Sequence, residues 1–200
     1  LTVYYSDPLA TLYQGDCREV LTSLPAESVH CVVTSPPYWS LRFYAGPQNA
    51  IWGGDPSCDH EFELIQNQVN SWGESGFCKK CGAWYGALGL EPTPELYIEH
   101  LLEILDLVTR VLREDGVVFL NIADTRWSGK TKSTWDTLAE YRIDGGCGKR
   151  PVGFAEVKRP RHNVIKRKDL CLIPERLAIA AQERGWYIRS KIIWCVTNPM

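Results

Sequence analysis

The feature that most constrains this chain is an apolar run that ends on two prolines. Residues 29–33 (VHCVV) are typical of a buried strand, and the segment 34–39 (TSPPYW) follows directly. Proline has no N–H to donate and restricts the residue before it, so a strand has to end here. The carbonyls around Ser35 and Pro36 then lack ladder partners and lie beside a hydroxyl and two aromatic rings. We expect this strand tip to bind an amino group on a planar base.

Helical and apolar strand patterns alternate along the rest of the chain. Nearly continuous apolar strands separated by helices predict an α/β fold with a mainly parallel sheet and helices on both faces. Only four strands are evident, so we expect the sheet to be incomplete and residues 1–200 to be the N-terminal portion of one larger domain. The expected strands are 9–14, 29–33, 117–122 and 186–194, and the expected helices are 17–24, 94–112 and 173–184.

Composition excludes several classes of protein. The chain has 22 Lys and Arg against 24 Asp and Glu, so its net charge does not indicate a nucleic-acid partner, and any basic surface must be local. It has no apolar run of about 20 residues, which a membrane span needs, and no signal peptide. Its eight cysteines could indicate a secreted disulfide scaffold, but proteins of that class are usually much shorter than this chain. We therefore expect a protein of the reducing cytoplasm without a membrane partner.

Four possible metal ligands lie in the segment 40–92, which otherwise looks irregular. The four form two close pairs separated by seventeen residues, a spacing typical of a tetrahedral zinc site: Cys58, His60, Cys78 and Cys81. They could also be unrelated residues of a cysteine-rich loop, but a loop this long needs a staple to become ordered. Because protein ligands fill all four positions, we expect a structural zinc and an inserted zinc-binding region over residues 40–92.

A basic segment lies within residues 125–168, which also look irregular. Between residues 149 and 168 there are eight Lys or Arg and a single acid, Glu156. Such a run is often only a solvated face, but here it stands out from a slightly acidic chain. We expect it to contact phosphate groups.

Several blocks of the sequence together resemble a known family. Segments 15–17 (GDC) and 32–39 (VVTSPPYW) resemble the DNA amino-methyltransferases, whose signature is (Ser/Asp/Asn)-Pro-Pro-(Tyr/Phe/Trp). Segment 120–124 (LNIAD) is similar as well, as are segments 168–194 and 198–200. These enzymes transfer a methyl group from S-adenosylmethionine to cytosine N4 or adenine N6, on a Rossmann-like sheet. The resemblance implies the permuted order in which the Ser-Pro-Pro-Tyr block comes first.

The resemblance also implies roles for individual residues. Ser35 Oγ and the carbonyl of Pro36, held by Pro37, would accept hydrogen bonds from the target amine, and Tyr38 would stack on a base flipped out of the duplex. Asp16 would bind the adenine amino group of the cofactor. Ser35 in place of Asp favours cytosine N4, and adenine N6 stays open. Apart from the resemblance, we expect contacts with double-stranded DNA from Trp39 and from residues of the basic segment: Lys158, Arg159, Arg161, Lys166 and Arg167.

The family's glycine-rich cofactor loop does not occur in these 200 residues. In the permuted order it lies downstream of Met200, so we expect the 200 residues alone to be inactive and to bind the cofactor weakly. Val196 also replaces a lysine common in the family. The resemblance implies a cytoplasmic enzyme of a bacterium, archaeon or phage, with a cognate restriction endonuclease that need not contact it. The alternatives are a methyltransferase of this fold that acts on RNA or on protein glutamine, and a non-enzymatic, zinc-stapled nucleic-acid-binding protein.

Overall fold

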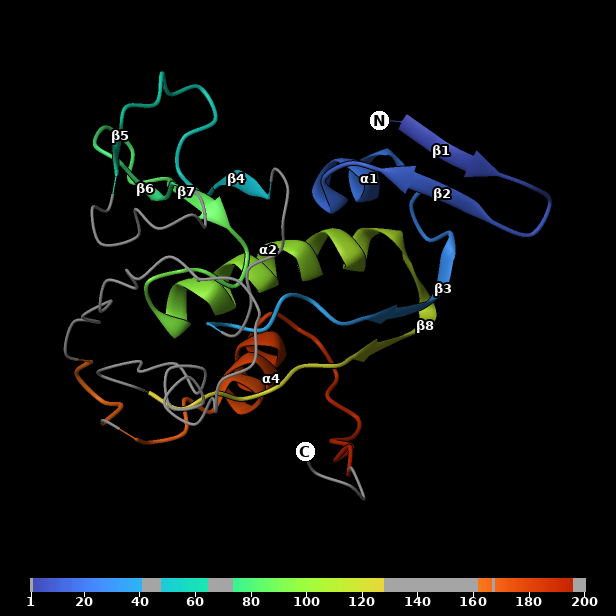
Figure 1. The fold of residues 1–200 in the computed structure, drawn as a ribbon. Coiled ribbons are helices and arrows are strands. Elements are labelled where there is room, and N and C mark those ends of the chain that lie inside the picture. The colour runs from blue at the N-terminus through green and yellow to red at the C-terminus, as the bar shows by residue number, and fades with distance from the viewer. Residues whose placement is uncertain (1, 41–47, 65–73, 128–161, 167, 196–200) are drawn as a thin grey trace, which may run out of the picture.

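The computed structural model describes residues 2–40, 48–64, 74–127, 162–166 and 168–195 of the chain. This part is a mixed α/β structure with one parallel strand pair, two antiparallel sheets and three helices (Figure 1). None of its helices combines the length and the apolar character that crossing a bilayer requires.

The parallel pair consists of β3 (Val29–Thr34) and β8 (Leu112–Leu120). Val33 is opposite Phe119 and Thr34 is opposite Leu120, so the two strands end side by side. The N–H of Asn121 donates to the carbonyl of Thr34 at 2.9 Å, and only Ser35 separates Thr34 from the two prolines. The expected strand that ends at the prolines is therefore present, and so is its parallel partner.

Helix α2 (Pro94–Val111) contributes several side chains to the core. It begins where Thr93 Oγ1 accepts from the N–H of Leu96 at 3.3 Å, with Pro94 in the first turn, as the sequence predicts. Helix α4 (Ile173–Glu183) packs against it. The core residues that these two helices contribute are Tyr97, Ile98, Leu101, Leu102, Leu105, Ile173, Leu177 and Ala181.

Helix α4 begins without a side-chain cap of its own. Leu172, the residue before it, has a left-handed backbone with φ 55°. The carboxylate of Asp124 accepts from the N–H groups of Leu172 at 3.0 Å and of Ile173 at 3.1 Å. Asp124, which follows β8, therefore fastens α4 to the end of the parallel pair.

The described helices do not cover both faces of the parallel pair, contrary to our expectation. Val33, Val117 and Phe119 point away from the core and are 77%, 50% and 54% exposed. Side chains of the alternate positions, such as Leu120, pack against the core instead. A strand presents successive side chains to opposite faces, so only one face is covered within the described residues.

The N-terminal strand differs from the expected one in its partner. β1 (Thr2–Ser6) and β2 (Thr11–Gln14) form an antiparallel hairpin, so the predicted strand 9–14 is shorter and does not join the parallel sheet (Figure 1). Helix α1 (Cys17–Ser23) follows as predicted and begins at Asp16.

The segment 40–92 was expected to be irregular, and this is wrong for its described residues. They form a four-stranded antiparallel sheet in the order β4-β7-β6-β5. Each strand has three or four residues, too few for a clear alternating pattern, and β4 pairs with β7, which lies far from it in the sequence. The strands are β4 (Asn49–Trp52), β5 (Phe62–Leu64), β6 (Gly76–Cys78) and β7 (Trp84–Ala87).

The predicted strand 186–194 is also wrong. These residues have no assigned secondary structure and no ladder partner within the described part of the chain, and Ile192, Ile193 and Trp194 are largely exposed. An apolar run forms a strand only where a neighbour supplies hydrogen bonds. Most of the predicted basic region, residues 128–161 and 167, lies outside the described residues.

Candidate active site

In the segment after β3, the carbonyl of Pro37 accepts a hydrogen bond, whereas the carbonyl of Pro36 has no donor among the described residues. The hydroxyl of Tyr97, on α2, donates to the carbonyl of Pro37 at 2.7 Å. Among the described residues, no hydrogen-bond donor reaches the carbonyl of Pro36. Ser35 is exposed, and its Oγ lies 3.2 Å from the hydroxyl of the half-buried Tyr38. The strand tip therefore presents a hydroxyl and a free carbonyl beside an accessible aromatic ring.

Trp39 anchors the end of this segment in the core. Its side chain is 1% exposed, it stacks on Trp127 with ring centroids 6.0 Å apart, and its Nε1 donates to the carbonyl of Glu91 at 3.0 Å. The expectation that Trp39 contacts DNA is therefore wrong for this structure, because the indole has almost no accessible surface.

Gly89 packs directly against the same segment. Its carbonyl accepts from the N–H of Ser40 at 2.8 Å. Its φ is +91°, a conformation that favours glycine, and a Cβ there would lie 3.1 Å from the carbonyl oxygen of Pro37. The backbone at position 89 thus limits where the Pro-Pro turn can lie.

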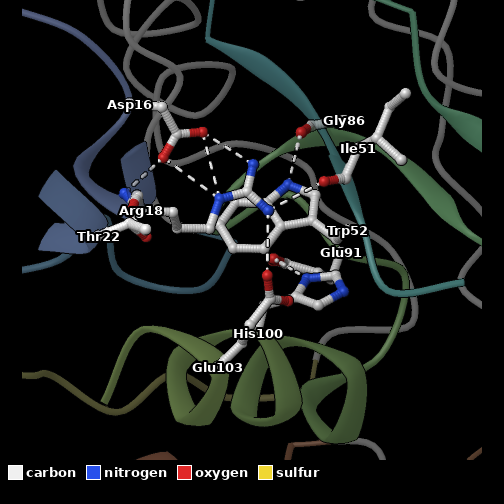
Figure 2. A network of polar contacts seen from close by, with 9 residues as sticks. All are labelled: Asp16, Arg18, Thr22, Ile51, Trp52, Gly86, Glu91, His100 and Glu103. Atoms are coloured by element: carbon white, nitrogen blue, oxygen red, sulfur yellow. Dashed lines mark hydrogen bonds and ion pairs between the residues drawn. The ribbon is translucent and has the colours of Figure 1, made fainter. Parts of the chain in front are cut away.

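Two buried side chains, Glu91 and His100, hold the backbone of Gly89 in place. The carboxylate of Glu91 accepts from the N–H of Gly89 at 2.8 Å and lies 2.9 Å from Nδ1 of His100. The His100 ring stacks between Trp52 and Trp84, at centroid distances of 4.7 and 5.3 Å. Burial raises the pKa of Glu91 above its usual value, although the hydrogen bond from His100 opposes this. Through Gly89, this network ties the Pro-Pro segment to α2 and to the four-stranded sheet. Figure 2 shows the contact between Glu91 and His100.

Asp16 is held at the start of α1 by its neighbour Arg18. Its carboxylate accepts from the backbone N–H of Arg18 at 2.9 Å and from the guanidinium at 2.8 Å. Partial burial raises the pKa of Asp16, but the hydrogen bonds and the charge of Arg18 outweigh burial and lower it below its usual value. Asp16 is therefore ionised at neutral pH, and both of its oxygens already accept hydrogen bonds from Arg18.

Arg18 also joins α1 to two other elements. Its Nη1 donates to the carbonyl of Ile51 on β4 at 2.9 Å and to Glu103 on α2 at 3.2 Å. Its guanidinium lies 4.0 Å from the ring centroid of Trp52 (Figure 2). A planar, permanently charged group with five donors suits this bridging position.

One cavity lies between Asp16 and the Pro-Pro segment. It has a volume of about 560 Å³, within the usual range for small-molecule sites. Asp16 and Pro37 line it from the two segments that the sequence singled out, Trp52 lines it from β4, and Leu88 lines it from just after β7. The cavity therefore reaches the Pro-Pro segment at Pro37, whereas Ser35, Pro36 and Tyr38 do not line it.

The four predicted metal ligands also come together, at the far end of the four-stranded sheet. Their ligand atoms all lie within 4.8 Å of one another. The Sγ atoms of Cys58 and Cys78 are 3.9 Å apart, and Sγ of Cys81 lies 3.4 Å from Nδ1 of His60. The sulfurs and the imidazole thus form one compact cluster from two separate turns.

The predicted DNA-contacting basic residues can be assessed only in part. Lys166 is exposed on the surface. Lys158, Arg159, Arg161 and Arg167 lie outside the described residues.

Sequence reasoning missed the residues that hold the site from behind. Tyr97 looks like one more apolar position of α2, and Glu91 and His100 belong to no motif. Arg18 is one of many charged residues in the sequence, and no motif distinguishes it from the others. No signal in the sequence indicated the ion pair of Arg18 with Asp16, because residues two positions apart on a helix do not face each other.

The comparisons with known proteins give the class of this chain. A family described as DNA methylase matches residues 29–200, which include β3, the Pro-Pro segment and α4. The chain therefore belongs to this DNA methylase family.

Curated relatives agree with the family. The type II methyltransferase M.XycI of Xanthomonas campestris pv. cyanopsidis is 35% identical over 96% of this chain and 48% of its own length. M.Cfr9I of Citrobacter freundii is 34% identical over 99% of this chain and 51% of its own length. M.SmaI of Serratia marcescens is 32% identical over 92% of this chain and 47% of its own length. The chain thus spans about half the length of these relatives, and no solved structure matches it.

Proposed function

We propose that this protein is a DNA amino-methyltransferase that methylates cytosine N4 at a specific site in double-stranded DNA. The observation that carries the proposal is the cavity shared by Asp16 and Pro37. A transferase needs its methyl donor and its acceptor side by side, and these residues belong to the two segments expected to hold them.

The strand tip would bind the amino group of the target base. The lone pair of an aromatic amine is conjugated with the ring, which makes the nitrogen a poor nucleophile. Two hydrogen bonds, to Ser35 Oγ and to the carbonyl of Pro36, would favour a pyramidal nitrogen and free its lone pair. Tyr97 already occupies the carbonyl of Pro37, so the carbonyl of Pro36 is the one left to accept.

The aromatic ring beside this carbonyl would hold the base. Tyr38 is half-buried and accessible next to Ser35, where it can stack on a base extruded from the duplex. Holding the amine in line with the methyl donor lowers the barrier by orientation, which is a large part of what such a site can supply.

The cofactor would be S-adenosylmethionine, which supplies a methyl group on a sulfonium centre. Asp16, ionised and fixed by Arg18, would accept a hydrogen bond from the adenine amino group. In the transfer, the amine nitrogen would take the methyl group from the sulfonium sulfur and would then release a proton to water. No side chain has to act as a strong base, because the methylated nitrogen is acidic.

The partners follow from the family and the relatives. The relatives are named type II methyltransferases, so we propose that a cognate restriction endonuclease acts on the same DNA sequence without needing to bind this protein. The exposed Lys166 would contact phosphate groups together with the neighbouring basic residues. We place the protein in the cytoplasm, where DNA is accessible.

The experiment that tests this proposal identifies the methylated nucleoside that the enzyme produces. Full-length protein is incubated with DNA and S-adenosylmethionine, and the nucleosides are identified by mass spectrometry. N4-methylcytosine supports the proposal, and N6-methyladenine would move the target to adenine. Ser35→Ala should lower kcat while the exposed Ser190→Ala does not. Binding of DNA without any methylated product would instead favour a non-enzymatic binding protein.

A further inference from the structure

We propose that Cys58, His60, Cys78 and Cys81 bind one structural zinc ion and that this ion supports the wall of the cavity that contains Asp16. The first half of this inference is independent of the proposed function. The second half rests on it, because it concerns the proposed cofactor pocket.

The spacing of the four ligand atoms fits a tetrahedral metal. With Zn–S bonds of about 2.3 Å and Zn–N bonds of about 2.0 Å, two sulfurs lie about 3.8 Å apart, and a sulfur and a nitrogen lie about 3.5 Å apart. The observed distances are 3.9 Å between Cys58 and Cys78 and 3.4 Å between Cys81 and His60. A disulfide would bring two sulfurs to about 2.05 Å, so these thiols are not bonded to one another.

The donor set favours zinc over other common metals. Three thiolates and one imidazole are soft or borderline ligands, whereas magnesium and calcium prefer oxygen. Four protein ligands complete a tetrahedron and leave no position for water or substrate. The site is therefore structural and takes no part in the reaction itself.

The local backbone is already shaped for the ion. The N–H of Gly82 donates to the carbonyl of Cys78 at 2.9 Å, and the N–H of Cys78 donates to the carbonyl of Ala83 at 2.7 Å. Gly82 has φ +77°, so the chain reverses tightly between Cys81 and β7. On the other side, the ring of Phe62 stacks on His60 at 5.4 Å and orients the imidazole.

The ligands come from two separate stretches of the chain. Cys58 and His60 lie between β4 and β5, whereas Cys78 ends β6 and Cys81 lies in the turn between β6 and β7. The β5–β6 ladder already places Phe62 opposite Cys78, and one ion bound to all four ligands adds a second link between the connection after β4 and the β6–β7 turn. The strands themselves are only three or four residues long, so their ladders are weak without such a link.

The ion lies close to the wall of the cavity through β4. Gly54, two residues after Trp52, passes so near the cluster that a Cβ there would lie 2.9 Å from Sγ of Cys81. Trp52 lines the cavity and lies under the guanidinium of Arg18, which holds Asp16. Loss of the ion would free the end of β4 and, with it, the support of Asp16.

The first experiment measures metal content. Untagged full-length protein is purified from medium containing zinc salt and analysed by plasma mass spectrometry. We expect about one zinc per chain in the wild type and a loss of zinc in Cys58→Ser and Cys81→Ser. Cys31→Ser and Cys195→Ser are the matched controls, because both thiols are exposed and lie outside the cluster, and both variants should keep their zinc.

A second measurement keeps the test decisive if a ligand variant fails to fold. Wild-type protein is produced in cobalt-supplemented medium, and tetrahedral thiolate-bound Co²⁺ should give intense visible absorption that added zinc removes. Wild type with neither zinc nor this absorption would overturn the metal site. Zinc retained fully by both Cys58→Ser and Cys81→Ser would overturn the assignment of its ligands.

The last measurement concerns the cavity. Calorimetry with S-adenosylmethionine should show affinity at least about fivefold weaker in Cys81→Ser than in Cys31→Ser. Equal affinities, with zinc lost only from Cys81→Ser, would overturn the supporting role and leave the metal site. If the wild type contains zinc but neither binds the cofactor nor methylates DNA, the proposed function is overturned and the metal site stands.

Discussion

Replacing Gly89 with alanine tests whether the backbone behind the Pro-Pro segment positions that segment for the reaction. Two effects of the substitution must be separated. Gly89 has φ +91°, and any L-residue is strained there by about 1–2 kcal/mol. The added methyl group would also lie 3.1 Å from the carbonyl oxygen of Pro37 and 3.3 Å from that of Tyr38.

Gly185 provides the matched control. It has φ +92°, nearly the same as Gly89, but a Cβ there has no heavy atom within 4 Å. Gly185→Ala therefore carries the backbone strain without the contact. Both variants should lower the free energy of unfolding by a similar amount, about 1–2 kcal/mol, and only Gly89→Ala should displace the Pro-Pro segment.

The size of the effect follows from the overlap. Ordinary contact begins at 3.4 Å, so the carbonyl of Pro37 must move by about 0.3 Å. If a misplacement of 1 Å costs about 100-fold in rate, a shift of about 0.3 Å costs roughly fourfold. We therefore expect kcat to fall about fourfold in Gly89→Ala and to stay unchanged in Gly185→Ala.

The assay combines two measurements on full-length protein. Urea unfolding gives the free energy of unfolding, and initial rates of methyl transfer at saturating DNA and cofactor give kcat. Equal kcat values in the two variants, at equal stability, would refute the idea that Gly89 limits the position of the Pro-Pro segment.

Two further variants test the contacts on either side of the cavity. Tyr97→Phe removes the hydroxyl that donates to the carbonyl of Pro37. Urea unfolding should show a free energy of unfolding lower by about 1–2 kcal/mol, and initial rates should show kcat lower by about tenfold. The control Tyr187→Phe, at an exposed tyrosine, should change neither quantity. Asp16→Asn should weaken cofactor binding by at least about tenfold in calorimetry, because Arg18 loses one of its two charged partners and the cofactor loses a charged acceptor. Since the pKa of Asp16 is lowered on folding, its contribution to stability is present above its unfolded value of about 3.9 and is lost as the pH falls through the folded value. Cofactor binding by the wild type should therefore not change between about pH 5 and 8, and a loss in this range would contradict the role of Asp16.

The exposed apolar side chains of the parallel pair show how the fold limits sequence reasoning. Val33 and Phe119 belong to strands whose pattern was read correctly, but one face of the pair is uncovered among the described residues. An apolar pattern records that a side chain avoids water in the folded protein. It does not record which element covers it.

By itself, the sequence determined the parts of this protein that depend on local chemistry. The two prolines end β3, Thr93 and Pro94 begin α2, and the spacing of the cysteines and His60 predicts the cluster that the structure assembles. Each of these follows from the bonding capacity of a few neighbouring residues, so a short stretch of sequence suffices.

Only the tertiary structure decided how distant segments meet. It paired β4 with β7, placed Tyr97 under the carbonyl of Pro37, buried Trp39, and brought Asp16 and Pro37 to one cavity. These contacts join residues separated by tens of positions, and many side chains could have satisfied the same local pattern. Which of them come together depends on the packing of the whole core, because buried polar groups must find partners wherever the fold places them.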